Sequence, residues 1–192
     1  MKMSSYKVLN NQIFSIGAFS ICPIRYQDRM AILKWRNEQL HHLRQDRALT
    51  DLDQENYFKN VVKKSFNEEK PNQLLFSYMH DGLCIGYGGL VHLNWSDKNA
   101  EISFIMDTKL EKKYFSKHWN YFLKLIEEVA FNELKFHKIF TFAFDLRPHL
   151  YAPIEAAGFV KEATLKEHFC FKGEYKDVII HTKFYHPNKL QK

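Results

Sequence analysis

The chain has few of the residues that signal a specialised scaffold. Its three cysteines, Cys22, Cys84 and Cys170, lie far apart, and no C-x-x-C pair occurs. Such a set does not fit a disulfide framework or a cysteine-based metal site, so we expect reduced thiols and no metal. No apolar run approaches the roughly 18 residues that a membrane-spanning helix needs, and residues 1–7 lack the apolar centre of a signal peptide. We therefore expect a cytoplasmic protein with no membrane partner.

Glycine is also scarce, with seven residues against seventeen Phe and ten Tyr in a chain of 192. This composition is typical of a packed globular protein, and we expect one domain over residues 1–192. The formal charge of +6 favours anionic ligands without identifying one. Nucleic acid is not expected, because the aromatic run at 140–144 has no interleaved Arg or Lys. His41-His42 lacks the other ligands of a metal site and is interpreted as a surface pair.

In the first part of the chain, residue patterns predict two strands and then two helices. The strands are expected at 12–17 and 19–24. The first helix follows Asp28, where apolar residues recur at helical spacing, and it ends at Arg36-Asn37. The second helix begins at Thr50-Asp-Leu-Asp53, which is a capping signature.

The rest of the chain alternates strands and helices. A hairpin is expected over 74–93, because Asp81-Gly82 suits its tight turn. A helix from about Ser116 to Glu133 separates a strand at 101–106 from one at 138–144, so these two strands are predicted to be parallel. After a short helix, a hairpin ends the chain. The fold class is α+β, with a single mixed, mostly antiparallel sheet and helices on both faces.

Five segments together resemble one known family. They are Trp35-Arg36-Asn37, residues 85–90, Glu101-Ile-Ser-Phe104, Ala156-Ala-Gly-Phe159, and the hairpin of 160–168 with 173–180. In this order the chain is similar to the GCN5-related N-acetyltransferase (GNAT) superfamily over nearly its whole length. It looks closest to the branch of ribosomal-protein alanine acetyltransferases and nucleotide-sugar N-acetyltransferases. The resemblance implies six to seven strands, with the fourth and fifth splayed apart.

The resemblance also implies chemistry. Acetyl-CoA is the implied co-substrate, and the implied acceptor is a primary amine of a small molecule, such as a nucleotide-linked amino sugar. A protein N-terminus is an alternative acceptor. The pantetheine arm is expected to pair with the backbone of Phe104, Ile105 and Met106. The family contains monomers and dimers, so a homodimer is a possible assembly.

The diphosphate-binding turn departs from the family pattern Gln/Arg-x-x-Gly-x-Gly/Ala. Tyr114, Lys117 and Trp119 stand at the three marked positions, so neither glycine is present. Two explanations stay open: positive charge and a hydroxyl replace the glycine cradle, or the chain kept the fold as a binding module and lost catalysis. The residues that would supply the charge and the hydroxyl are Lys112, Lys113, Ser116 and Lys117.

Acetyl transfer needs a base for the attacking amine and an acid for the leaving thiolate. The resemblance favours Glu101 as the base. Tyr151 is the candidate acid, because it lies one helical turn before Ile154, where the family usually has a tyrosine. Arg147 stands in the strand-to-helix loop that meets the cofactor.

The acceptor pocket is expected at the end of the first helix. Trp35, Arg36 and Asn37 would border it together with Tyr87. An arginine at this place suits the diphosphate of a nucleotide-linked sugar.

Overall fold

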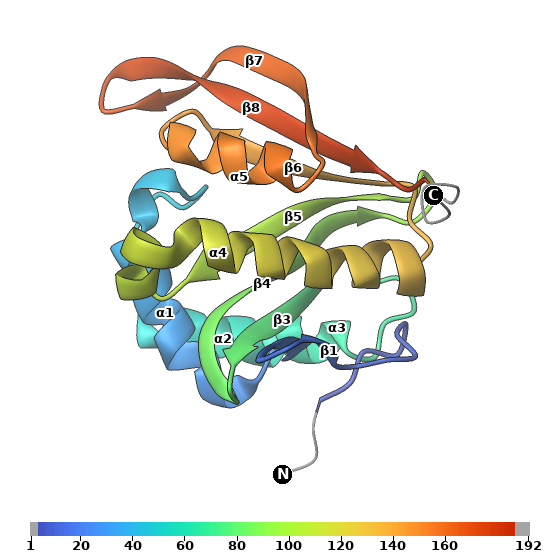
Figure 1. The fold of residues 1–192 in the computed structure, drawn as a ribbon. Coiled ribbons are helices and arrows are strands. Elements are labelled where there is room, and N and C mark those ends of the chain that lie inside the picture. The colour runs from blue at the N-terminus through green and yellow to red at the C-terminus, as the bar shows by residue number, and fades with distance from the viewer. Residues whose placement is uncertain (1–3, 187–192) are drawn as a thin grey trace.

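One mixed sheet of eight strands organises residues 4–186, the part of the chain that the computed structural model describes (Figure 1). The strand order is β1-β2-β3-β4-β5-β6-β8-β7. In chain order the elements are β1 (Phe14–Ile16), β2 (Phe19–Pro23), α1 (Arg29–Glu38), α2 (Asp51–Tyr57), α3 (Lys63–Ser65), β3 (Gln73–His80), β4 (Leu83–Asn94), β5 (Asn99–Met106), α4 (Thr108–Glu127), β6 (Lys138–Phe144), α5 (Tyr151–Ala156), β7 (Val160–Phe171) and β8 (Glu174–Phe184).

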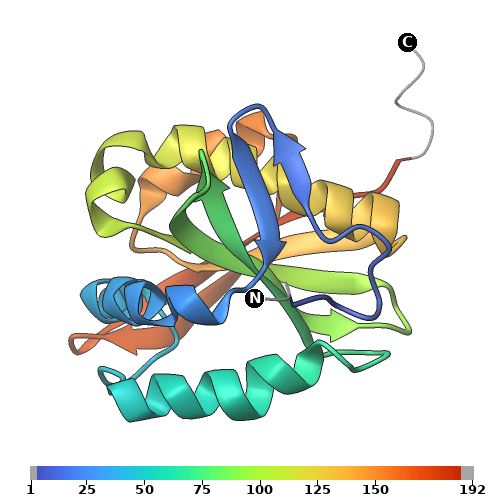
Figure 2. The ribbon, with the colours of Figure 1, turned by 90° about the horizontal axis from the view of Figure 1, so that it is seen from below.

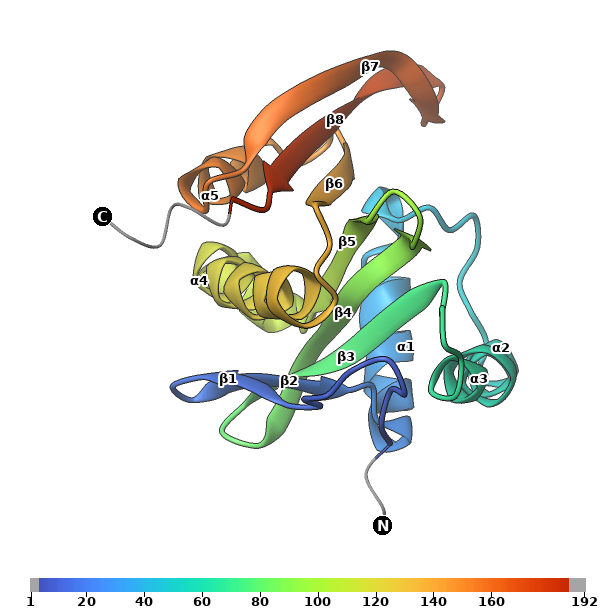
Figure 3. The same cartoon turned by 90° about the vertical axis from the view of Figure 1, so that its right-hand side faces the viewer.

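Helices cover both faces of this sheet, as the sequence predicted. Figure 2 shows the sheet between α4 on one side and α2 with α3 on the other, and Figure 3 shows α5 on the α4 side and α1 on the opposite side. The three-residue edge strand β1 brings the number of strands to eight, where six to seven were expected. The predicted class and architecture are confirmed.

The pairing between β5 and β6 is parallel and short. It joins Asn99 to Lys138, Ala100 to Ile139 and Glu101 to Phe140, and it ends there although both strands continue. The two strands lie together at one end and separate toward the other (Figure 1). The predicted splay is therefore present, and Glu101 lies at its vertex.

Alternation along β5 divides its side chains between two hydrophobic layers. Phe104 packs beneath α4, where its ring stacks on Trp119 and Phe122 with centroids 5.3 Å and 4.3 Å away. Ile105 belongs to the layer on the other face, with Trp35 of α1 and other residues. By the same alternation Glu101 shares the α1 face with Ile105.

The helix α4 begins earlier than the sequence pattern predicted. Asp107 caps it at Thr108, because its Oδ1 accepts hydrogen bonds from the backbone N–H of Lys109 at 2.8 Å and of Leu110 at 3.3 Å. Helical geometry then breaks at Tyr114 (φ −129°, ψ 15°), and a second helical segment starts at Phe115. The predicted start near 116 corresponds to this second segment.

Gly88 of β4 allows two neighbouring elements to approach closely. A Cβ atom at this position would lie 2.1 Å from the backbone oxygen of Ser103 on β5 and 2.9 Å from the Phe122 ring of α4. No side chain fits there without moving the backbone, so this glycine sets the spacing between β4 and β5.

We predict that Gly88→Ala lowers the free energy of unfolding by about 3 kcal/mol, because the methyl group overpacks backbone against backbone. Gly17→Ala is the matched control: Gly17 has φ +58° but nothing within 4 Å of a Cβ atom, so it should cost only about 1 kcal/mol. Urea unfolding of both variants measures the difference. Equal losses would contradict the close approach.

Candidate active site

A cavity of about 320 Å³ lies where β5 and β6 separate, and residues from both faces of the sheet line it. On the α4 and α5 side its lining includes Phe115, Trp119, Arg147, Tyr151 and His181. On the α1 side its lining includes Arg36, Arg44, Tyr87, His92 and Glu101. The cavity therefore connects the two sides of the sheet at the splay.

Glu101 is buried at the vertex of the splay, with 6% of its surface exposed. Arg44 makes an ion pair with its Oε1, and His92 Nε2 lies 3.9 Å from its Oε2. Burial raises the pKa of the Glu101 carboxyl, although both neighbours act in the opposite direction. A carboxylate with a raised pKa is a better proton acceptor near neutral pH.

Tyr151 lies on the opposite side of the sheet, at the start of α5. Its hydroxyl donates a hydrogen bond to Asp145 Oδ1 at 2.6 Å, and its ring stacks on His181 with centroids 5.3 Å apart. Burial and the bond to Asp145 both raise its pKa. The hydroxyl therefore holds its proton at neutral pH.

Arg147 lies beside Tyr151 in the cavity wall. Its nearest carboxylate is Glu111 of α4, with Nη1 and Oε1 3.8 Å apart. Burial lowers the pKa of Arg147 to about 10, which leaves the guanidinium charged at neutral pH. It supplies a positive charge that water screens only in part.

The other predicted phosphate ligands lie on the surface of α4. Lys112, Lys113 and Ser116 are exposed, and Lys117 Nζ lies 5.7 Å from the centroid of the Phe19 ring on β2. None of these four belongs to the cavity lining. The part of α4 that does reach the cavity is its second segment, through Phe115 and Trp119.

Two of the predicted acceptor residues line the cavity. The Arg36 guanidinium donates to the Tyr87 hydroxyl through Nη1 at 2.8 Å, and to Gln45 Oε1 through Nε at 2.9 Å and Nη2 at 2.6 Å. Trp35 is instead buried in the hydrophobic layer, where its Nε1–H donates to Asp107 Oδ2 at 3.2 Å. It ties α1 to the start of α4.

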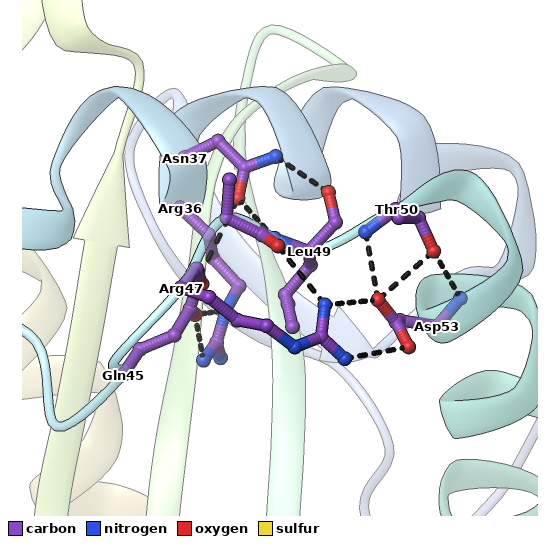
Figure 4. Close-up of polar contacts among 8 residues, drawn as sticks. Arg36, Asn37, Gln45, Arg47, Leu49, Thr50 and Asp53 are labelled. Carbon is purple, nitrogen blue, oxygen red and sulfur yellow. Dashed lines mark hydrogen bonds and ion pairs between the residues drawn. The ribbon is translucent and has the colours of Figure 1, made fainter.

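Asn37 holds the segment that follows α1. Its Nδ2 donates to the Leu49 backbone oxygen at 2.8 Å, and its Oδ1 accepts from the Leu49 N–H at 2.9 Å (Figure 4). Both ends of the Asn37 amide thus replace a backbone partner for Leu49. The side chain acts on the loop and not on the cavity lining.

Three residues of the cavity were not predicted from the sequence: His42, His181 and Arg44. His42 was interpreted as a surface residue, but burial and nearby Arg147 lower its pKa to about 3, so it is neutral. His181 is 1% exposed, and its Nε2 has no hydrogen-bond partner among the described residues, with Glu155 Oε1 3.5 Å away. Arg44 lies in a loop. No motif marks any of them, since distant segments bring them together.

Residues 4–186 contain neither a metal-binding cluster nor a helix suited to crossing a membrane. No group of three or more His, Cys, Asp or Glu side chains is arranged there to hold a metal ion. Within the same range, no helix combines the length and the apolar character that crossing a membrane requires.

Solved structures share this fold. Spermidine N-acetyltransferase from Vibrio cholerae, in complex with CoA and spermine, superposes with a TM-score of 0.76 at 19% identity and covers 88% of this chain and 96% of that chain. A dodecameric structure of the enzyme from the same organism gives 0.71 at 20% identity, with 88% and 95% covered. At such identities the likeness establishes the fold, and the expected homodimer stays a prediction. No curated protein matches the chain by sequence at a significant level.

The family is established by a sequence model. The model of the acetyltransferase (GNAT) domain matches residues 21–180, which is most of the chain. The expectation of an acetyl-CoA-dependent N-acetyltransferase is confirmed at the level of the family, whereas the ribosomal-protein and nucleotide-sugar branch stays a prediction. The chain belongs to the GNAT family of acetyltransferases, enzymes that take an acetyl group from acetyl-CoA.

Proposed function

We propose that the protein acetylates a primary amine of a small molecule that also carries an anionic group. A nucleotide-linked amino sugar is one acceptor of this kind. The observation that carries the proposal is the charge of the cavity. Among the described residues that line it, Glu101 is the one carboxylate, whereas three residues carry guanidinium groups: Arg36, Arg44 and Arg147.

This charge distribution bears on the choice of acceptor. The structural neighbours are named for spermidine and spermine, which are polycations. A polycation needs carboxylates, but Glu101 is already paired with Arg44. Arg36 and Arg44 on the α1 side would repel additional positive charge and attract a phosphate or carboxylate. The cavity therefore favours an amine with an anionic partner group over a polyamine.

The residues of the splay fit acetyl-CoA, which supplies an acetyl group activated as a thioester when it is bound. Beyond Glu101, the edge of β5 that faces β6 has no strand partner in the described part of the chain, so the backbone of residues 104–106 can pair with an extended arm of amides. On the α5 side of the cavity, His181 Nε2 is a buried nitrogen without a hydrogen-bond partner among residues 4–186. The Arg147 guanidinium and the N-terminus of the second segment of α4, at Phe115, offer positive charge for phosphates.

The exposed lysines remain part of the proposal. Lys112, Lys113 and Ser116 would contact phosphate groups that extend beyond the cavity mouth, at the surface of α4. Lys117, which lies over Phe19, would have to turn to join them. Trp35 and Asn37 would support the acceptor pocket through Asp107 and Leu49.

The two proposed catalytic groups work from opposite sides of the sheet. Glu101 accepts a proton from the acceptor, which leaves a neutral amine able to attack the thioester carbonyl. A carbon–nitrogen bond forms, the carbon–sulfur bond breaks, and Tyr151 supplies the proton for the departing sulfur. The acetylated nitrogen releases its surplus proton to water, and the Tyr151 hydroxyl regains a proton from water. Glu101 is held by Arg44, and Tyr151 is held by Asp145.

The donor and acceptor can be tested with matched ligands. We expect isothermal titration calorimetry to detect acetyl-CoA binding, and CoA release to be faster with glucosamine 6-phosphate than with glucosamine by about tenfold or more in kcat/KM. The two amines differ only in the phosphate. A lack of heat with acetyl-CoA would favour the binding module that lost catalysis, and faster turnover of spermidine would overturn the anionic acceptor.

The role of Glu101 is tested by Glu101→Gln, which removes the base and keeps the shape. We expect kcat to fall by about 10²- to 10⁴-fold, the usual contribution of a general base, while the Kd for acetyl-CoA changes less than about threefold. Stopped-flow turnover and calorimetry measure the two effects. Unchanged turnover would remove Glu101 from this role.

Glu101→Gln should also change how the stability of the protein depends on pH. The pKa of the Glu101 carboxyl is higher in the folded state than in the unfolded state, so the folded state binds this proton more tightly. The free energy of unfolding of the wild type therefore falls as the pH rises from the unfolded-state pKa through the folded-state pKa. We therefore expect Glu101→Gln to match the wild type near pH 4 and to be at least as stable at pH 7, by urea unfolding. A variant that is less stable at pH 7 would show that pairing outweighs burial.

A further inference from the structure

We infer that Arg44 determines acceptor specificity by exchanging its ion pair with Glu101 for one with the anionic group of the acceptor. The inference rests on the proposed function and adds a mechanism to it. Binding of an acceptor that carries an anionic group would draw Arg44 away and free Glu101 to act as the base. An amine without an anionic group would leave Glu101 paired with Arg44.

Arg44 spans the splay on the α1 side. Its Nη2 pairs with Glu101 at the vertex on β5, while its guanidinium carbon lies 4.8 Å from the centroid of the Phe142 ring on β6. These two contacts place one cation across the opening between the diverging strands. An acceptor that enters from this side must pass or displace it.

The guanidinium has capacity for a second anion. Its side chain is 47% exposed, whereas that of Glu101 is 7% exposed. Within residues 4–186 the guanidinium makes one hydrogen bond, to Glu101, although it carries five N–H donors in a fixed fork. The unused donors can bind a phosphate or carboxylate in the bidentate geometry that arginine prefers.

The backbone around Arg44 is fixed, so the exchange involves its side chain. Gln45 is held by Arg36, and Leu49 by Asn37 (Figure 4). Arg47 pairs with Asp53, with Nη1 2.7 Å from Oδ2, and Thr50 caps α2. The loop that follows Arg44 is therefore tied to α1 and α2, and a rotation of one long side chain is enough to free Glu101.

The exchange would also change the proton affinity of the base. The charged or titratable groups that face Glu101 among the described residues are Arg44 from the loop and His92 from β4. Both favour the ionised carboxylate, and burial opposes them. When Arg44 turns to the acceptor, the pKa of Glu101 rises further, because its closest cation has left. Acceptor binding therefore strengthens the base that the reaction needs.

Competition between Glu101 and the ligand gives a signature that a structural role would not. With CoA at saturation to fill the donor site, we titrate inorganic pyrophosphate by calorimetry. Arg44→Ala should weaken its affinity by about tenfold or more, and Glu101→Gln should tighten it by about threefold, because the freed guanidinium no longer has an internal anion. In the variant that carries both substitutions, Glu101→Gln should no longer tighten pyrophosphate binding, because Arg44 is absent.

Lys34→Ala is the matched control, since Lys34 is an exposed cation on α1 outside the cavity lining. The affinity of this variant for pyrophosphate should change less than about twofold. If Arg44→Ala has no effect, or if both single variants weaken binding, the inference is wrong. CoA affinity reports folding in each variant. If CoA itself fails to bind, the proposed function fails. The role of Arg44 can then still be tested in the protein without CoA, where Arg44→Ala should weaken pyrophosphate binding and Glu101→Gln should strengthen it.

Discussion

The early end of the pairing between β5 and β6 is the constraint on which the site depends. Beyond Glu101 and Phe140 the two parallel strands separate. On one face, the stacked rings of Phe104, Trp119 and Phe122 support β5 after it leaves β6. The separation creates a cavity that both faces of the sheet line. It also leaves one carboxylate buried at the vertex and reachable from the α1 side.

Burial and charge act together in this cavity. Desolvation raises the pKa of Glu101 and lowers those of His42 and His181, so the histidines are neutral. Desolvation also lowers the pKa of Arg147, but a value of about 10 leaves it charged. Arg36 and Arg44 add two more cations to the lining, and this excess of positive charge is the basis of the proposed preference for an anionic acceptor. In the proposed function, the phosphates of the coenzyme would lie on the α5 side and the anionic acceptor on the α1 side.

Much of the fold could be predicted from local signals. Asp81 and Gly82 adopt the positive φ angles of 48° and 80° that their turn requires, and the predicted capping box at Thr50 is present. The parallel arrangement of β5 and β6 followed from the helix between them. The course of α4 was less predictable, because Tyr114 breaks the helix without a proline or glycine. The directions in which Lys112, Lys113 and Lys117 point could not be predicted either, since periodicity alone does not say which neighbour a long side chain contacts.

The sequence by itself determined the family, the order of strands and helices, and the position of Glu101 on the strand that borders the cavity. These depend on turn residues, caps and hydrophobic periods, which act over a few positions along the chain. Only the tertiary structure decided that Arg44 covers Glu101 and that His42 and His181 line the same cavity. It also decided that Trp35 supports Asp107 from within the core. Such contacts join segments that are distant in sequence, and the balance between desolvation and pairing that sets each charge exists only after those segments have packed.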